Sequence, residues 1–286
     1  YNMDLTSPRT IRNIQEQFGF TFKKGLGQNF LTARNILEEI VDAAEIESGV
    51  IEVGPGFGVL TSELAQNSDK VVTIEIDERL IDVLDYTLAE YDNVKIINED
   101  ILKLDLKKVI DDEFNGEKVS IAANLPYYIT TPIITKLLEE KLPIKNIVVM
   151  VQKEVAERMS AKPSTKNYGA ITVLCQYYTE QSIVANVPAS LFVPPPKVDS
   201  AVLELKVLDK PSVEVKDEGV FFRVVKAAFS QRRKTLLNCL SANFAIPKDE
   251  ISTLLESIGI APSRRGETLS LEEFANIADT LLQKIK

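Results

Sequence analysis

The sequence predicts an α/β protein built on a doubly wound parallel sheet, followed by a small all-helical C-terminal domain. The first observation is that five apolar, β-branched runs alternate with helical patterns between residues 49 and 151. The second is that these runs are apolar throughout, as in strands buried on both faces of a parallel sheet. The third is the helical spacing of apolar residues from Val220 onward. Together they favour two regions of different architecture.

The predicted strands follow one another with helices between them. They cover residues 49–53, 70–76, 93–98, 118–123 and 144–151. Between the second and the third strand, residues 78–90 predict a helix. Its apolar side chains Leu80, Ile81, Leu84 and Leu88 fall on one face.

Further helices are predicted on both sides of these strands. Ser7 and Pro8 form a cap and first-turn pair, which indicates a helix start. Thr32 is expected to cap a helix over residues 33–44. After the last of the five strands, residues 153–160 predict another helix.

The boundary between the two predicted domains falls in the segment 208–218. Mixed strands end in residues 197–208, and only helical patterns follow, including capped helices within residues 245–260 and 270–282. We therefore expect a sheet domain over residues 1–210, with an N-terminal helical lid, and a small helical domain over residues 211–286.

Composition excludes several classes of protein. With 45% hydrophobic and 26% charged residues, the 286-residue chain is typical of a globular protein. It has no apolar run of the roughly 18 residues that a membrane helix needs, and its two cysteines suit a reducing cytosol. The sequence has no histidine, which excludes the usual Ser-His-Asp and Cys-His chemistries. We expect a cytoplasmic protein without a membrane anchor or a metal.

Polar and glycine residues at the ends of three successive strands indicate a nucleoside site. Gly54 and Gly56 follow the first strand, where glycine lets the backbone approach a ligand closely. Glu75 ends the second strand, where a carboxylate can accept hydrogen bonds from ribose hydroxyls. Asp100 follows the third, where an acid can bind an adenine amino group. The structural alternative is a tight strand–helix turn with two solvated acids.

The glycine spacing leaves two cofactors open. A dinucleotide fingerprint has the spacing G-x-G-x-x-G and binds a pyrophosphate at a helix start. Here the spacing is G-x-G-x-G, and Glu52 lies two residues before the first glycine. Its charge would repel a pyrophosphate but suits a cation, which favours S-adenosylmethionine. NAD is the second candidate.

The stretch "IAANLPYYITTP", at residues 121–132, predicts a site for a planar amine. Asn124 ends the fourth strand, and Pro126 leaves the turn at Leu125 rich in acceptors because proline has no N–H. An exocyclic amine could donate to the Asn124 side chain and to a backbone carbonyl, while Tyr127 supplies a face for stacking. These acceptors would stabilise the charge that develops as a methyl group arrives. A structural turn with a core tyrosine is the alternative.

The order of these motifs resembles the ribosomal RNA adenine N6-dimethyltransferases over nearly the whole chain. The matching segments are "GLGQNFL" (25–31), "EVGPGFG" (52–58), "EID" (75–77), "NED" (98–100), "NLPYYITTP" (124–132), "FVPPPKVDSAV" (192–202) and "FSQRRKTL" (229–236). The resemblance implies a Rossmann-like methyltransferase domain that uses S-adenosylmethionine.

The resemblance also implies roles for individual residues. Tyr127 and Phe192 match the pair that sandwiches the target base, beside Asn124 and Leu125. Without the family, Phe192 could equally be a core anchor before three prolines. The implied cofactor site combines a lid over the methionine end with the strand-end residues, and we assign to it Gln28, Asn29, Leu31, Gly54, Gly56, Glu75, Ile76, Asp100, Ile101 and Asn124.

A basic stripe indicates contact with RNA phosphates. The net charge is −9, yet residues 221–248 hold six basic residues and no acidic one. We expect a helix that carries three consecutive basic residues, 232–234, and a second positive edge just before the N-terminal lid. These two edges would flank the cofactor and substrate site. The RNA-binding residues expected there are Arg232, Arg233 and Lys234 with Lys23 and Lys24, and Arg264 and Arg265 could add to them. A solvated basic face is the alternative.

The resulting hypothesis is a monomeric RNA methyltransferase that acts on the small ribosomal subunit. The resemblance implies dimethylation of N6 on two adjacent adenosines near the 3′ end of 16S rRNA during ribosome biogenesis. Three alternatives remain open. They are a large-subunit rRNA methyltransferase that confers macrolide resistance, an assembly checkpoint in which RNA binding outweighs catalysis, and a dehydrogenase.

Overall fold

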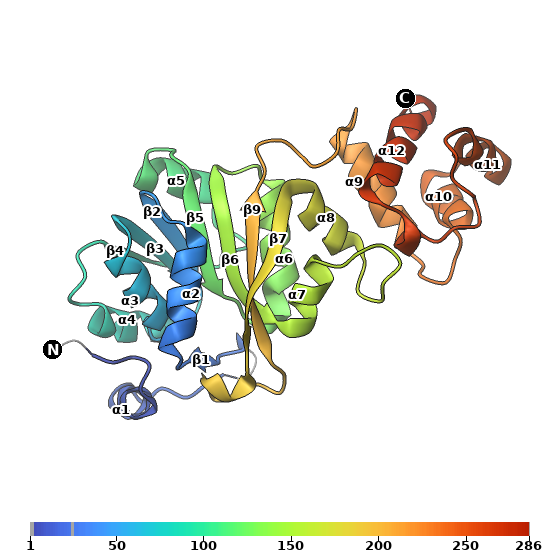
Figure 1. The fold of residues 1–286 in the computed structure, drawn as a ribbon. Coiled ribbons are helices and arrows are strands. Elements are labelled where there is room, and N and C mark those ends of the chain that lie inside the picture. The colour runs from blue at the N-terminus through green and yellow to red at the C-terminus, as the bar shows by residue number, and fades with distance from the viewer. Residues whose placement is uncertain (1–2, 24–25, 286) are drawn as a thin grey trace. The chain divides into compact units, whose positions relative to one another are not determined.

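The computed structural model describes residues 3–23 and 26–285, which form two compact units (Figure 1). The first unit comprises residues 1–156 and 181–207, and the second comprises residues 157–180 and 208–286. The chain therefore divides close to the predicted boundary, but residues 157–180 belong with the C-terminal helices. From the sequence we assigned that segment to the first domain.

The described residues of the first unit centre on a seven-stranded sheet of order β4-β3-β2-β5-β6-β9-β7. Its strands are β2 (Gly49–Val53), β3 (Lys70–Glu75), β4 (Val94–Asn98), β5 (Val119–Asn124), β6 (Ile144–Gln152), β7 (Thr179–Val187) and β9 (Ser200–Val207). The first five in spatial order are parallel, and Val53 is in register with Ile74 and Ala123. The carboxyl ends of β2, β3 and β5 therefore meet at one edge.

The Rossmann-like fold is confirmed, and the five strands predicted between residues 49 and 151 are parallel. β9 runs antiparallel to β6, so the sheet is mixed. Apolar residues in a strand report that both faces are buried, but they carry no information on the direction of the strand. β9 is mostly buried, and nothing in its residues signals this reversal.

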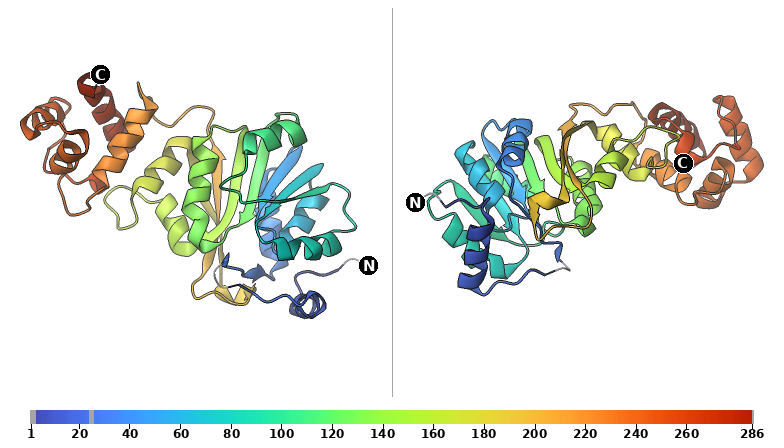
Figure 2. Two further views of the ribbon diagram at one scale, coloured as in Figure 1. Left: turned by 180° about the vertical axis from the view of Figure 1, so that it is seen from behind. Right: turned by 60° about the horizontal axis from the view of Figure 1, so that its bottom comes forward.

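Helices cover both faces of this sheet. They are α2 (Arg34–Ala44), α3 (Val59–Gln66), α4 (Ile81–Thr87), α5 (Leu106–Phe114), α6 (Thr130–Glu139) and α7 (Lys153–Met159), with one-turn 3-10 helices η2 (Glu78–Leu80) and η3 (Tyr127–Ile129). α2 lies in front of the sheet in Figure 1, and the view from behind in Figure 2 shows α5 and α6 on the opposite face. On the α2 face, Ile36 and Ile40 join a buried cluster with Ala122 and Val148.

The N-terminal segment packs on the first unit through α1 (Pro8–Phe18) and a cluster of phenylalanines. Phe30 lies with its ring centroid 4.4 Å from that of Phe57. α2 begins at Arg34, but Thr32 does not cap it. The Thr32 hydroxyl instead donates to the carbonyl of Leu191 at 2.8 Å. Thr32 therefore fastens this segment to a distant loop and does not satisfy the helix N-terminus.

The second unit has its own buried core. It contains α8 (Ala170–Tyr178), α9 (Glu218–Ala228), α10 (Leu236–Phe244), α11 (Lys248–Ser257), the 3-10 helix η5 (Gly266–Thr268) and α12 (Leu271–Ile285). Tyr177 and Phe221 stack with centroids 4.9 Å apart, and Phe274 is fully buried. The packing of α8 against α9 explains why residues 157–180 belong to this unit.

Candidate cofactor and substrate site

A cavity that opens to solvent lies at the carboxyl ends of the first unit's strands. Every residue predicted to bind the cofactor lies on its wall, namely Gln28, Asn29, Leu31, Gly54, Gly56, Glu75, Ile76, Asp100, Ile101 and Asn124. Residues from separate segments of the chain are thus brought together by the sheet edge and by the lid, which we define as residues 26–31.

The glycine turn after β2 needs glycine on steric grounds. Gly54 and Gly56 have φ angles of +73° and +58°, in the left-handed region. A Cβ atom on Gly56 would lie 2.6 Å from the ring of Phe30. The absence of a side chain at Gly56 therefore lets the backbone of the turn pack directly against the Phe30 ring of the lid.

Glu52 lies on the wall of the cavity but points into the protein. Its side chain is buried, and its Oε1 accepts hydrogen bonds from the hydroxyls of Thr61 and Thr73, the latter at 2.8 Å. Burial raises the pKa of Glu52 to about 7, against the two hydroxyl bonds, which lower it. Near neutral pH this carboxyl is therefore only partly charged, which weakens the argument from its charge against a pyrophosphate.

Glu75 is held rigidly at the end of β3. It is 6% exposed, and its Oε1 accepts a hydrogen bond from the N–H of Asp77 at 2.9 Å. Burial is the main reason that its pKa is raised to about 7. Beside it, Ile76 is 50% exposed and presents an apolar surface to the cavity, and Asp100 lies on the neighbouring wall. An acid, an apolar surface and a second acid fit a ribose and an adenine.

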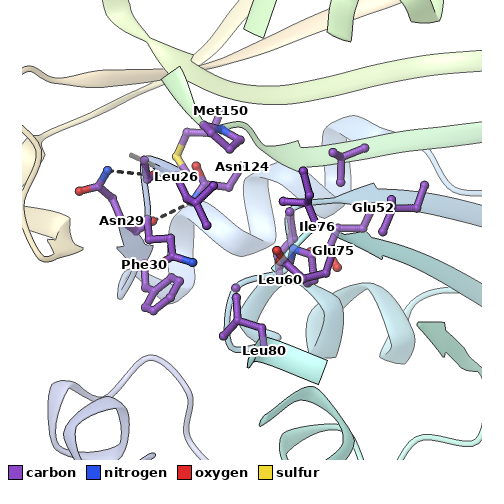
Figure 3. A pocket seen from close by; sticks show the side chains of 18 of the residues that line it. Leu26, Asn29, Phe30, Glu52, Leu60, Glu75, Ile76, Leu80, Asn124 and Met150 are labelled. Carbon is purple, nitrogen blue, oxygen red and sulfur yellow. Dashed lines mark hydrogen bonds between the residues drawn. The ribbon is translucent and has the colours of Figure 1, made fainter. Parts of the chain in front are cut away.

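Asn124, at the end of β5, lies beside Asn29 of the lid, as Figure 3 shows. Its Nδ2 donates to the carbonyl of Asn29 at 3.2 Å, so the side-chain oxygen is the atom that remains to accept a bond. The N–H of Leu125 donates to the carbonyl of Met150 at 3.2 Å, and the Leu125 side chain is buried. Any contribution of Leu125 to a ligand must come from its backbone carbonyl.

The two aromatic residues assigned to the target base are not part of the cavity wall. Tyr127 is half-buried, and its hydroxyl lies 2.8 Å from that of Ser200. Phe192 is 2% exposed and belongs to a buried cluster with Leu31. It lies in β8 (Phe192–Val193), which pairs with β1 (Phe30–Leu31) of the lid. In this structure the ring of Phe192 therefore has no face open to a base.

Sequence reasoning missed Tyr128, which lies on the wall of the cavity and is 54% exposed. From the sequence we assigned the stacking role to Tyr127, the first tyrosine of the family motif, and left its neighbour unassigned. A second aromatic residue directly after the first was the available signal.

A network of polar contacts ties the lid to the loop after β3. Gln28 donates through Nε2 to Asp77 at 3.0 Å, and Asp77 pairs with Arg79 at 2.6 Å. Arg79 also donates to the carbonyl of Thr21 and lies over the ring of Phe20, 4.6 Å from its centroid. Burial raises the pKa of Asp77, but the bonds from Arg79 and Gln28 outweigh it and lower the pKa. We call these contacts the Asp77 latch.

The predicted basic residues lie in two separate units. Lys23 is exposed before the lid, whereas Lys24 lies outside the described residues. Arg232, Arg233 and Lys234 are exposed, but they occupy a turn between α9 and α10, so the predicted helix there is wrong.

The turn has a local cause in the second unit. Thr235 caps α10 by accepting from the N–H of Asn238, which ends the turn directly after the triplet. Arg232 donates to the carbonyl of Lys166 at 3.0 Å. Arg264 pairs with Glu273 and donates to Thr268, so its charge is already compensated within the fold.

Neither a metal site nor a membrane-spanning helix is found in the described part of the chain. Among those residues, no group of three or more acidic or cysteine side chains is arranged to hold a metal ion. Within residues 3–23 and 26–285, no helix is both long enough and apolar enough to cross a membrane.

The fold and the cavity define a class of protein. A Rossmann-like sheet, a glycine turn that lets a ligand approach the backbone, and acids at the strand ends are typical of proteins that bind a nucleoside-containing cofactor at this edge. The apolar and acidic wall of the cavity suits that cofactor.

Comparison with known proteins narrows this class. The family model described as "Ribosomal RNA adenine dimethylase" matches residues 19–283. Proteins named "Ribosomal RNA small subunit methyltransferase A" from Bacillus mycoides (strain KBAB4) and Bacillus cereus (strain B4264) are each 54% identical over 285 residues, covering 98% of both chains.

Solved structures agree with this result. A dimethyladenosine transferase from Plasmodium falciparum aligns with a TM-score of 0.75 and 30% identity, over 89% of this chain and 98% of its own. The 23S rRNA methyltransferase ErmE aligns with a TM-score of 0.67 and 27% identity, over 89% of this chain and all of its own.

The chain belongs to the ribosomal RNA adenine dimethylase family. It is an rRNA adenine N6-methyltransferase, and its cofactor is S-adenosylmethionine rather than the dinucleotide that the glycine spacing alone left open.

Proposed function

We propose that this enzyme places two methyl groups on N6 of each of two adjacent adenosines near the 3′ end of 16S rRNA, within the small ribosomal subunit. The observation that carries the proposal is the position of Asn124. Its side chain lies at the end of β5 between the nucleoside-binding wall and the lid, with its Nδ2 held by Asn29. The 54% identity to small-subunit methyltransferases supports the choice of subunit.

The walls of the cavity hold the cofactor in this proposal. Glu75 accepts hydrogen bonds from the ribose hydroxyls, and Asp100 binds the adenine amino group between Ile76 and Ile101. Gln28, Asn29 and Leu31 of the lid cover the methionine end. When bound, S-adenosylmethionine supplies a methyl group on a cationic sulfur that is ready for transfer to a nucleophile.

Asn124 and Leu125 prepare the amine of the target base. The Asn124 side-chain oxygen accepts one N6 hydrogen, and the Leu125 carbonyl accepts the other. Both acceptors stabilise the positive charge that develops on N6 during the transfer. Holding the amine about 3–3.5 Å from the methyl carbon contributes further. The proton released afterwards is acidic enough to pass to water, so the chemistry requires no histidine.

Tyr127 and Phe192 bind the target base on either side in our proposal. Tyr127 already has a fixed ring, since its hydroxyl bonds to Ser200. Phe192 is buried beside Leu31, so stacking requires β8 to move when the base enters. Because β8 pairs with β1 of the lid, this movement couples entry of the base to the position of the lid.

The exposed basic residues contact RNA phosphates. Lys23 belongs to the first unit, and the exposed turn Arg232, Arg233 and Lys234 belongs to the second. Such contacts position a folded RNA and do not read its sequence. The target adenosine leaves its stack to reach Asn124. We further propose that the enzyme acts in the cytoplasm as a monomer.

A second candidate substrate is the large subunit. The observation that supports this candidate is the alignment with the 23S rRNA methyltransferase ErmE over 89% of this chain. The lower identity of that structure, 27% against 54% for the small-subunit relatives, places it second.

Substitution of Asn124 tests the proposed role directly. In methyl transfer to small subunits from an unmethylated strain, Asn124→Ala should lower the rate constant at least 100-fold, by analogy with the loss of one preorganised polar partner. Binding of S-adenosylhomocysteine should change by no more than a few fold. A variant that still methylates at the wild-type rate would overturn the assignment of Asn124.

A further inference from the structure

The two consecutive tyrosines after β5 point to different parts of the site. Tyr127 is half-buried and reaches Ser200, at the start of β9, with a hydroxyl separation of 2.8 Å. Tyr128 is 54% exposed and lies on the wall of the cavity. The one-turn helix η3, whose Ile129 N–H donates to the carbonyl of Pro126, holds both residues. The Tyr128 side chain therefore lines the cavity, whereas the Tyr127 side chain lies beside Ser200 and outside the cavity wall.

Tyr128 lines the same cavity as Glu75, Ile76 and Asp100, the residues assigned to the nucleoside. Partial burial raises the pKa of the Tyr128 phenol, and the charges of Asp100 and Glu75 raise it further. By contrast, the charge that raises the pKa of Tyr127 is that of Asp199, next to Ser200. These charge effects agree with the position of Tyr128 on the cavity wall that also carries the two acids assigned to adenine and ribose.

Tyr128 and Ile76 are the two most exposed large apolar side chains of the first unit among the described residues, at 54% and 50%, and both line this cavity. Exposed apolar surface on a cavity wall is covered favourably by a ligand. A flat adenine offers a matching face, because stacking on an aromatic ring adds to the gain from burial.

We propose that Tyr128 is a positioning residue for the cofactor: its ring packs against the adenosyl part of S-adenosylmethionine, while Tyr127 faces the target base. The inference rests on the proposed function, which assigns the nucleoside end to Glu75 and Asp100. Tyr128 acts by holding the cofactor and takes no part in the methyl transfer. It thereby also slows release of the spent cofactor, which must be exchanged between the two transfers to one adenosine.

The test is the binding of S-adenosylhomocysteine in the absence of RNA, measured by calorimetry on the full chain. Tyr128→Ala should weaken binding about three- to tenfold, as expected when one aromatic stacking partner is removed. Tyr128→Phe keeps the ring and should bind within about twofold of the wild type. Tyr127→Ala is the matched control, since it removes the adjacent ring and should leave this affinity unchanged.

A second variant guards against misfolding of the first. The chain has no tryptophan, so Tyr128→Trp introduces a single fluorophore at the proposed contact. Its emission should shift when S-adenosylhomocysteine is added.

The possible outcomes distinguish the role of Tyr128 from the proposed function. Wild-type affinity in Tyr128→Ala, or unchanged emission in Tyr128→Trp, would overturn the role of Tyr128 and leave the enzyme's function intact. A loss of affinity in Tyr127→Ala as large as that in Tyr128→Ala would also overturn it. Failure of the wild-type chain to bind S-adenosylhomocysteine would instead count against the proposed function.

Discussion

Glu52 is a buried carboxyl whose protonation the fold controls. Its pKa is raised from 4.5 to about 7 by burial, although the hydroxyls of Thr61 and Thr73 bond to it. The folded chain binds this proton more tightly than the unfolded chain. The stabilising effect is therefore fully present below about pH 4.5 and is lost as the pH rises through about 7.

Glu52→Gln should therefore stabilise the protein at alkaline pH. Glutamine can still accept from both hydroxyls but carries no charge, so the free energy of unfolding at pH 8 should rise by on the order of 1–3 kcal/mol. At pH 4 the difference should largely disappear. Denaturant unfolding at both pH values measures this, with the exposed Glu117→Gln as the control. A variant that is less stable at pH 8 would contradict the account.

Tyr127 and Phe192 are predicted to act on the target base and not on the cofactor. Tyr127→Ala and Phe192→Ala should each reduce methyl transfer by roughly tenfold or more, since one aromatic stack contributes about 1–3 kcal/mol per base. Binding of S-adenosylhomocysteine should remain nearly unchanged in both. If either substitution abolished cofactor binding, the assignment of these residues to the base would be wrong.

Among the elements, the lid depends on contacts that are distant in sequence. The Asp77 latch joins Phe20, Thr21 and Gln28 to the loop after β3, and the β1–β8 pair joins the lid to Phe192. Removing one partner of a buried polar pair lowers the free energy of unfolding more than removing one partner of an exposed pair does. The position of the lid should therefore be sensitive to Asp77.

Asp77→Ala should loosen the lid. We expect faster hydrogen exchange at residues 26–31 and a several-fold faster release of S-adenosylhomocysteine. Lys107→Ala, which removes an exposed ion pair with Asp111 on α5, should change neither. Equal effects of the two substitutions would show that the latch does not hold the lid.

The apolar runs between residues 49 and 151 correctly predicted five strands of the sheet and the sheet edge at which the site forms. Gly54, Glu75, Asp100 and Asn124 could be placed together from sequence because parallel strands end at the same edge. The direction of β9, the turn at residues 232–234 and the bond from residue 32 to residue 191 could not, since each depends on contacts between distant segments. The burial of Phe192 has the same origin, because its strand partner belongs to the lid, far away in sequence.

At the scale of the whole molecule, a net charge of −9 coexists with exposed basic residues in each unit. Phosphate contacts give RNA binding a salt dependence whose slope reports how many contacts are made. The turn Arg232, Arg233 and Lys234 should therefore contribute a measurable part of that slope.

Reversal of these three charges to glutamate should weaken binding to small-subunit RNA. The slope of log K against log salt should become shallower by roughly 0.7–0.9 for each phosphate that the protein no longer neutralises. Arg264 is excluded from the substitution because it pairs with Glu273. An unchanged slope would mean that these three residues form a solvated basic surface and do not contact RNA phosphates.

The role of the protein in ribosome assembly can be separated from its chemistry. Asn124→Ala should fold and bind RNA yet transfer methyl groups poorly. In a deletion strain it should restore growth and subunit assembly less well than the wild type does. Full restoration by this variant would favour the checkpoint alternative.

The most direct test of the central claim is to identify the methylated nucleoside. Small and large subunits from an unmethylated strain would be incubated with the protein and S-adenosylmethionine labelled in its methyl group. We predict label in N6-dimethyladenosine at two adjacent positions near the 3′ end of small-subunit RNA, and almost none with Asn124→Ala. Label in the large subunit, or in neither subunit, would contradict the proposed function.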